Sequence, residues 1–149
     1  MKIRLMCPED YDEVYNLWTV TEGMCLRNYD DSKEGITKFI LHNPTSNFVA
    51  EENGQIIGAI LCGMDGRRAY IYHATVKPEY RRKGIGKELL NAVYGAIQQA
   101  GIRKNGLLVL KDNHVGNEFW RACGWQERTE LNYYSINMKL QEEDENTPK

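Results

Sequence analysis

Residues 81–87, RRKGIGK, form a short cationic turn between a strand-like segment and a helical pattern. Backbone N–H groups at the start of a helix, together with the helix dipole, attract anions. Glycines in such a turn let the backbone approach an oxygen closely, because no Cβ intervenes. The charged donors in it are Arg81, Arg82, Lys83 and Lys87. We therefore expect the turn to bind phosphate, and a pyrophosphate would fit it.

Two better-known phosphate-binding loops do not match this stretch. A Walker A loop requires Ser or Thr after the Gly-Lys pair, but Glu88 follows Lys87 and no glycine stands five residues before Gly86. The dinucleotide-binding fingerprint requires a third glycine where Leu89 stands. The alternative interpretation is an ordinary strand-to-helix turn with solvated cations.

The elements on either side must position this turn. RAYIYHATV (68–76) is rich in aromatic and β-branched residues and predicts a strand. Apolar residues recur at three- and four-residue spacing from Ile85 to Ala100, and Gly101 stands at a C-cap position, which predicts a helix. GLLVLK (106–111) is a continuous apolar run, which indicates a strand buried on both faces and parallel to 68–76.

The remaining segments predict an α/β (α+β) architecture with a mixed sheet. Asn53-Gly54 joins two strand patterns and is a strong hairpin signal. Together the segments predict a sheet of six to seven strands with about four helices on both faces. The further strands are expected at 3–6, 47–64 (two strands) and 132–140, and the further helices at 8–20, 33–44 and 113–125.

Composition indicates one globular domain. The 149 residues are 42% hydrophobic and 27% charged, so we expect a single domain over 1–140, followed by an acidic, disordered tail, 141–149. No apolar run is long enough to cross a bilayer, and no signal-peptide core or metal-ligand spacing is seen, so a cytoplasmic protein without metal or membrane partner is expected. The net charge of −2 argues against nucleic acid as a partner.

The cationic turn resembles a motif of the GCN5-related N-acetyltransferases. The resemblance is to motif A of that family, in which Arg-x-x-Gly-x-Gly follows a strand and precedes a helix, and here the residues are Arg81, Gly84 and Gly86. A second family motif is matched in spacing by Asn113, Gly116, Phe119, Trp120, Gly124 and Trp125. The phrases DGRRAYIYHATV and GNEFWRACGW also resemble small bacterial acetyltransferases of the YpeA kind.

The resemblance implies acetyl-CoA as acetyl donor, a primary amine as acceptor, and direct transfer in a ternary complex. It implies a splayed pair of parallel strands that holds the cofactor, with the pyrophosphate on the amides of residues 82–86 and the pantetheine arm on strand 68–76. The cofactor-binding residues on this interpretation are Ala74, Val76, Arg81, Arg82, Lys83, Gly84, Ile85, Gly86, Lys87, Asn113 and Trp120.

The resemblance also implies catalytic positions. The amide of Val76 is the candidate donor to the oxyanion of the tetrahedral intermediate. Trp120 stands where the family usually has its general-acid tyrosine, and an indole N–H is no proton source in that sense. Leu108 replaces the glutamate of protein N-terminal acetylases, which weakens that activity as an interpretation.

Replacement acids and bases must come from other residues. Tyr70 and Tyr72 are candidates, because alternation places them on the strand face of Ala74, with sheet packing as the alternative. His73 has an ordinary pKa suited to a base, but alternation turns it to the opposite face unless a β-bulge intervenes, and a hydrogen-bonded core histidine is expected.

The acceptor groove is expected under the irregular stretch after the first helix. Asp30 and Asp31 would attract a cationic acceptor, whereas Arg67 and Arg68 would bind an acidic one, and the sequence leaves both open. Packing in the core is the alternative for Trp18. The candidate acceptor-binding residues are Trp18, Met24, Leu26, Tyr29 and Tyr134, with Tyr133 beside the last.

Two other functions remain open at this point. Loss of the usual acid at Trp120 would suit an acyl-CoA-binding sensor with little catalytic activity. The run Arg81–Lys83 would suit nucleic-acid binding, but no aromatic residues are interleaved with it. The sheet edges and the last strand would also allow a homodimer.

Overall fold

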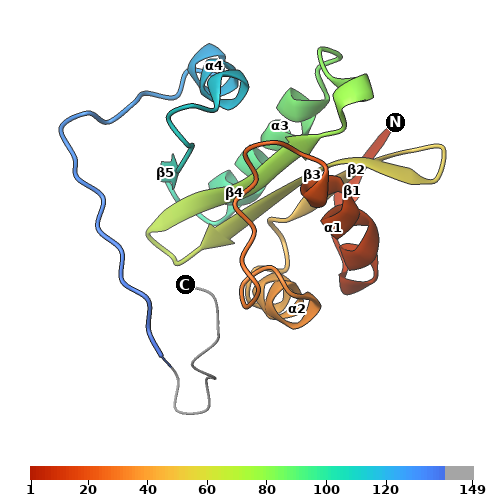
Figure 1. Ribbon diagram of the computed structural model, residues 1–149, viewed down its shortest axis with the longest axis horizontal. Helices are drawn as coiled ribbons and strands as arrows, with labels where there is room; N and C mark the ends of the chain where they lie inside the picture. Colours follow the sequence, from red (N-terminus) through yellow and green to blue (C-terminus); the bar gives the residue numbers. More distant parts are fainter. Residues whose placement is uncertain (140–149) are drawn as a thin grey trace.

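A computed structural model describes residues 1–139, and its centre is a five-stranded mixed sheet in the order β1-β2-β3-β4-β5 (Figure 1). The first four strands pair antiparallel, and β4 pairs with β5 in parallel. The strands are β1 (Lys2–Leu5), β2 (Phe48–Glu52), β3 (Gln55–Met64), β4 (Arg68–Val76) and β5 (Lys104–Leu107). The predicted tail, 141–149, lies outside the described residues.

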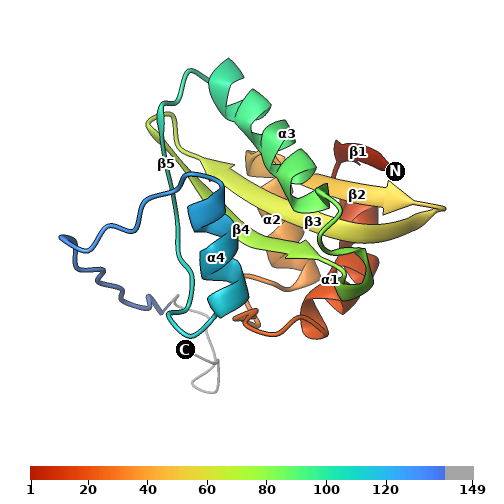
Figure 2. The same cartoon turned by 90° about the horizontal axis from the view of Figure 1, so that it is seen from above.

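Helices cover both faces of this sheet, as the sequence predicts (Figure 2). Helix α3 packs on one face through Leu89, Val93 and Ile97, all nearly inaccessible to solvent. Helices α1 and α2 pack on the other face around Trp18 and Ile40. The helices are α1 (Tyr11–Thr19), α2 (Lys33–His42), α3 (Ile85–Gln99) and α4 (His114–Ala122), with short 3-10 turns η1 (Pro8–Asp10) and η2 (Pro78–Tyr80).

The local signals place most of these elements correctly. Asn53 and Gly54 both have positive φ, at 51° and 75°, which is the backbone of a two-residue hairpin turn. Gly101 and Gly124 end α3 and α4 with φ of 74° and 90°. Ser32 caps α2, because its side chain accepts a hydrogen bond from the amide of Gly35.

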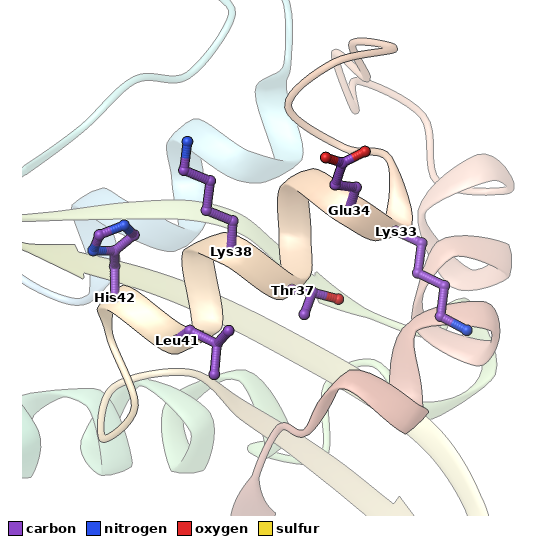
Figure 3. A pocket seen from close by; sticks show the side chains of 6 residues that line it. All are labelled: Lys33, Glu34, Thr37, Lys38, Leu41 and His42. Atoms are coloured by element: carbon purple, nitrogen blue, oxygen red, sulfur yellow. The ribbon is translucent and has the colours of Figure 1, made fainter.

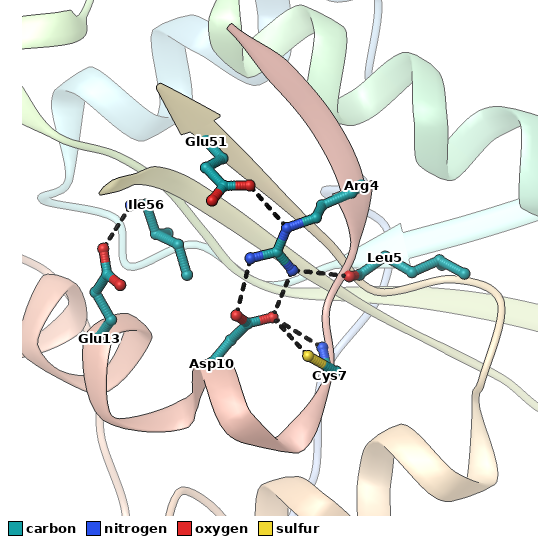
Figure 4. A network of polar contacts seen from close by, with 7 residues as sticks. All are labelled: Arg4, Leu5, Cys7, Asp10, Glu13, Glu51 and Ile56. Atoms are coloured by element: carbon teal, nitrogen blue, oxygen red, sulfur yellow. Dashed lines mark hydrogen bonds and ion pairs between the residues drawn. The ribbon is translucent and has the colours of Figure 1, made fainter. Parts of the chain in front are cut away.

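The first strand and first helix are locked together by charge. The Arg4 guanidinium donates two hydrogen bonds to the Asp10 carboxylate, at 2.8 and 2.9 Å, and its Nε donates to Glu51 of β2 (Figure 4). The Cys7 amide adds a fourth bond, to Asp10 Oδ2. This bidentate network fixes where α1 begins relative to the sheet.

The prediction of six to seven strands is wrong for the described residues. Residues 126–139 contain no strand, and Figure 1 shows them running clear of the sheet. Their side chains are exposed, with Tyr134 at 86% and Ile136 at 85%. An alternating pattern makes a segment able to pair, but the pattern alone does not decide whether the segment joins the sheet.

Strand β5 also differs from its prediction. It covers 104–107 instead of 106–111, and Leu108 and Leu110 are 65% and 47% exposed instead of buried on both faces. The parallel pairing stops at Ile71–Leu107, while β4 continues for five more residues. The two strands therefore separate, and one edge of β4 from Tyr72 onward has no strand beside it within residues 1–139.

Candidate active site

The cationic turn provides a row of free amides. Arg81 N–H still bonds to Pro78 and Glu88 N–H to Gly84, but within residues 1–139 no hydrogen bond is made by the amides of residues 82–87. The turn is compact because Arg82 and Gly84 both adopt positive φ, at 63° and 82°. Unpaired amides at the start of a 15-residue helix fit a pyrophosphate well.

The side chains of the turn are distributed as an anion site requires. Arg81, Arg82, Lys83 and Lys87 are all exposed, and Lys83 Nζ lies 5.3 Å from the centre of the Tyr80 ring. Ile85 is buried in the core, so only its amide faces the turn. The cations can therefore move toward a ligand, whereas the backbone is fixed.

Gly86 also has a packing role that the sequence does not indicate. A Cβ at this position would lie 3.0 Å from Phe119 Cε1, so the missing side chain makes room for the aromatic ring of α4. A Cβ at Gly84 would meet nothing within 4 Å, but its φ of 82° disfavours other residues. Gly84 thus shapes the turn, and Gly86 docks α4 against α3.

The open edge of β4 points a backbone donor outward. Lys77 N–H donates to Ile57 O of β3 at 2.7 Å, so the amide of Val76, one residue earlier, points away from β3. It faces the side of β4 on which β5 no longer pairs with it. The Val76 carbonyl on the same side accepts a hydrogen bond from Arg81 Nε at 3.2 Å, which ties the edge to the cationic turn.

A β-bulge interrupts β4 between Tyr72 and Thr75. The register with β3 shifts by one residue between Ala59 and Leu61, and His73 has a φ of 48°. Because of the bulge, alternation along the strand no longer predicts that Ala74, which is exposed, lies on the same face of the sheet as Tyr70 and Tyr72. The β-bulge therefore allows His73 to lie on the same face of the sheet as Tyr72.

Tyr72 and His73 both face α1 and α2. The Tyr72 ring packs edge-on against Phe39 of α2, and the His73 ring lies 4.8 Å from Trp18 of α1, measured between centroids. His73 Nε2 is 2.8 Å from Asp31 Oδ1. Burial raises the pKa of Tyr72, with smaller contributions from Tyr70 and other neighbours.

Tyr70 and Tyr72 line a small hollow of about 210 Å³. Tyr70 lies across Gly106 of β5, where a Cβ would come within 2.9 Å of its ring. The other lining residues come from the ends of β3 and β4 and from Asn43, and they include Gly63, Met64, Asp65 and Arg68. A larger hollow of about 640 Å³ lies along the outer surface of α2, and its described lining, including Lys33, Lys38 and Leu41, comes from that helix alone (Figure 3). It contains none of the predicted site residues.

The predicted acceptor residues are only partly brought together. Trp18 is completely buried, so it belongs to the core and presents no surface to a groove. Met24 and Leu26 pack against the same core, and Tyr29 is 41% exposed. Tyr134 lies on the extended segment after α4 and is not brought to the groove, because that segment forms no strand.

Helix α4 closes the other side of the opening. Asn113 caps this helix through Gly116 N–H at 3.0 Å, so its side-chain oxygen is already committed. Its side-chain amide lies close to Gly23 of the loop between α1 and α2. Trp120 packs edge-on between Phe119 and Trp125, which makes it part of the α4 aromatic cluster.

The described part of the chain contains no candidate metal site and no candidate membrane-spanning helix. Within residues 1–139 there is no group of three His, Cys, Asp or Glu side chains that could hold an ion. No helix in the same range is both long and apolar enough to cross a bilayer.

Comparison with known proteins assigns the family. The model of the acetyltransferase (GNAT) family matches residues 11–125, and the chain belongs to this family. It is accordingly an acetyl-CoA-dependent N-acetyltransferase, and the acceptor is not given by family membership. The matched range contains both the cationic turn and α4.

Solved structures show the same fold. Ard1 from Thermoplasma volcanium superposes with a TM-score of 0.73 at 22% identity, over 83% of this chain and 80% of that one. The PaiA N-acetyltransferase of Thermoplasma acidophilum, solved with coenzyme A, gives 0.71 at 25% identity, over 82% and 87%. The aminoglycoside acetyltransferase AAC(6')-Iy, solved with a bisubstrate analogue, gives 0.72 at 20% identity, over 92% and 98%.

Proposed function

We propose that this protein transfers the acetyl group of acetyl-CoA directly to a primary amine of a small molecule or a peptide. The observation that carries the proposal is the row of free amides in residues 82–87, which ends where the unpaired edge of β4 begins. One molecule of coenzyme A is long enough to use both. Its pyrophosphate would lie on the amides and its pantetheine arm along the strand edge.

The residues of the chain then have defined tasks. The outward amide of Val76 stabilises the negative oxygen of the tetrahedral intermediate, an interaction worth about 3 kcal/mol in acyl transfers. The acceptor enters from the α1 and α2 side, past Tyr72. Trp120 lines the opposite wall and gives up no proton, so the thiolate leaves without an acid on α4.

The acceptor class stays open between small amines and peptides. AAC(6')-Iy was solved with a CoA-linked acetylneamine, and PaiA is named only as an N-acetyltransferase. Asp30 is exposed in the loop between α1 and α2, next to the buried Asp31, and its carboxylate favours a cationic amine. The narrower assignment to YpeA-like enzymes rests on the sequence phrases alone.

The second candidate function is an acyl-CoA-binding sensor. It is favoured by Trp120, which stands in place of the family's usual tyrosine hydroxyl and packs within the aromatic cluster of α4. The sensor would bind acetyl-CoA as tightly as the enzyme and would release no coenzyme A in the presence of any amine.

We also propose that two copies associate. The outer edge of β5 has no partner strand within residues 1–139, and the exposed, alternating residues 126–139 come from the same chain. Such a segment from one copy can extend the sheet of another.

Calorimetric binding of acetyl-CoA tests the proposed cofactor site. The double change Arg82→Glu and Lys83→Glu should weaken binding about 100-fold, because each charged donor contributes on the order of 1.5 kcal/mol. The matched control is Lys33→Glu with Lys38→Glu, which makes the same charge change on the outer surface of α2. Equal affinities for the two double variants would contradict the assignment.

Release of free coenzyme A with spermidine, neamine, free amino acids and a lysine peptide then tests the reaction. Turnover with one class identifies the acceptor. Tight binding without turnover across the whole panel would favour the sensor instead.

A further inference from the structure

His73 and Asp31 form a pair that the family motifs do not include. Asp31 comes from the loop between α1 and α2, His73 from the bulge in β4, and 42 residues separate them in the chain. The Asp31 side chain is 6% exposed and the His73 side chain is 17% exposed. The sequence indicates a core histidine at this position, but it does not indicate the carboxylate beside it.

The carboxylate is held rigidly. Asp31 Oδ2 accepts a hydrogen bond from Arg27 N–H at 2.7 Å, and Asp31 N–H returns one to Arg27 O at 2.9 Å. The Tyr11 hydroxyl of α1 donates to the Asp31 carbonyl at 2.6 Å. Both the side chain and the backbone of Asp31 are therefore fixed before any ligand binds.

The hydrogen bond to Asp31 also decides which nitrogen of His73 carries the proton. An ionised carboxylate can only accept, so Nε2 must carry the hydrogen and Nδ1 of the neutral ring keeps its lone pair. Nδ1 has no hydrogen-bond partner within residues 1–139, and it is not among the buried unpaired atoms of that range. The His73 side chain is 17% exposed, so a ligand can approach the ring.

The position of His73 suits a reaction at the open edge of β4. It lies three residues before Val76, about 10 Å along a strand, and the imidazole extends toward the acceptor side of the sheet. The positive φ of His73 is a strained conformation, and the Thr75 hydroxyl supports it by bonding to the His73 carbonyl at 3.0 Å. Bulges of this kind frequently redirect side chains at active sites.

We infer that His73 is the general base of the acetyl transfer and that Asp31 is the positioning residue that fixes its tautomer. This inference rests on the proposed function. Nδ1 takes one proton from the ammonium of the acceptor, directly or through one water, and passes it to solvent. The free amine attacks the thioester carbonyl, the C–S bond breaks, and the second nitrogen proton ends on the sulfur of coenzyme A.

Other ionisable groups lie around the pair. Asp30 and Arg27 lie in the same loop, Tyr11 approaches from α1, and Tyr72 is the neighbour on β4. Burial and the Asp31 charge raise the pKa of Asp30, although Arg27 and His73 oppose that rise.

The pH dependence of kcat/KM tests the base, with the most active amine of the panel above as substrate. His73→Ala should lower kcat/KM about 100-fold at pH 7, a typical contribution of a general base. The deficit should shrink as the pH approaches the pKa of the amine, because the acceptor then arrives already deprotonated. Added imidazole should restore part of the rate.

The control variant is His42→Ala, which removes an exposed histidine at the end of α2 and should leave the whole profile unchanged. Asp31→Asn should lower kcat/KM by about 10-fold, with thermal unfolding recorded to show that the loop still folds. A His73→Ala deficit that is the same at every pH would overturn the role of base.

Nitrogen NMR of the His73 ring provides a readout that does not depend on turnover. We expect the Nε2–H tautomer at neutral pH in the wild type and a loss of this preference in Asp31→Asn. The Nδ1–H tautomer in the wild type would overturn the inference even if the protein proves to be an active acetyltransferase. If no amine is acetylated while the tautomer is as expected, the proposed function fails and the pairing stands.

Discussion

At the scale of single residues, three glycines in α3 and its preceding turn differ in what their positions require. Gly84 is required by its φ of 82°, and Gly86 by the ring of Phe119. Gly95 lies in the exposed middle of α3, where an added Cβ would meet nothing within 4 Å. Only Gly95 is free of a local constraint.

We therefore predict opposite effects for two glycine-to-alanine changes. Gly95→Ala should stabilise the protein by about 1 kcal/mol, because alanine has the higher helix propensity, and should raise Tm by about 2–4 °C. Gly84→Ala should cost about 1 kcal/mol, because alanine is strained at positive φ. Thermal unfolding by circular dichroism measures both. A destabilised Gly95→Ala variant would contradict this assessment of α3.

At the scale of elements, the start of α1 depends on one carboxylate. Burial would raise the pKa of Asp10, but its hydrogen bonds to Arg4 and Cys7 outweigh burial, and the net pKa is lowered in the folded protein. A lowered folded pKa means that the ionised form stabilises the fold. That contribution is present above the unfolded pKa of about 3.9 and is lost as the pH falls through the lower, folded value.

The corresponding prediction concerns Asp10→Asn. It should destabilise the protein by about 2 kcal/mol between pH 5 and 7, because charge-assisted bonds to Arg4 are lost. The difference from wild type should begin to shrink below about pH 4, where the carboxylate of the unfolded chain takes up its proton, and should disappear only below the lower pKa of the folded protein. Urea unfolding at several pH values measures it. Asp12→Asn, an exposed change in the first turn of α1, is the control and should cost no more than about 0.5 kcal/mol. A difference that persists unchanged to pH 2.5 would show that Asp10 acts through packing alone.

At the scale of the whole molecule, residues 126–139 decide whether the sheet is complete in one copy. Leu131, Tyr133, Tyr134, Ile136 and Met138 are each more than 60% exposed, an unusual density of large apolar side chains on a surface. Pairing with the outer edge of β5 in a second copy would cover them.

We expect a dimer at micromolar concentration by light scattering coupled to size exclusion. Ile136→Pro should shift the mass toward the monomer, because proline removes a ladder N–H. Leu41→Asp, which changes an exposed apolar residue on α2, should leave the mass unchanged. A wild-type monomer at 100 µM, on the order of the highest concentrations that such an experiment uses, would exclude this association.

The sequence alone determined the elements whose signals are local. The hairpin at Asn53-Gly54, the glycine ends of α3 and α4, the periodic core of α3 and the glycine turn before α3 all follow from neighbouring residues, and the structure contains each of them. The parallel pairing of β4 and β5 was also predictable, because a helix separates two strands. The family resemblance was detectable in the turn and in α4 because each motif consists of residues that are close together in the sequence.

Only the tertiary structure decided how those elements meet. The end of β5 at Leu107, the bulge at His73 and the pairing of His73 with Asp31 depend on residues that are distant in sequence, so no local pattern reports them. Burial of Trp18 and the contact between Gly86 and Phe119 are likewise packing outcomes. Neighbouring residues determined the cationic turn, whereas long-range packing determined the surroundings of His73, because hydrogen bonds and ring contacts there join α1, its following loop and β4.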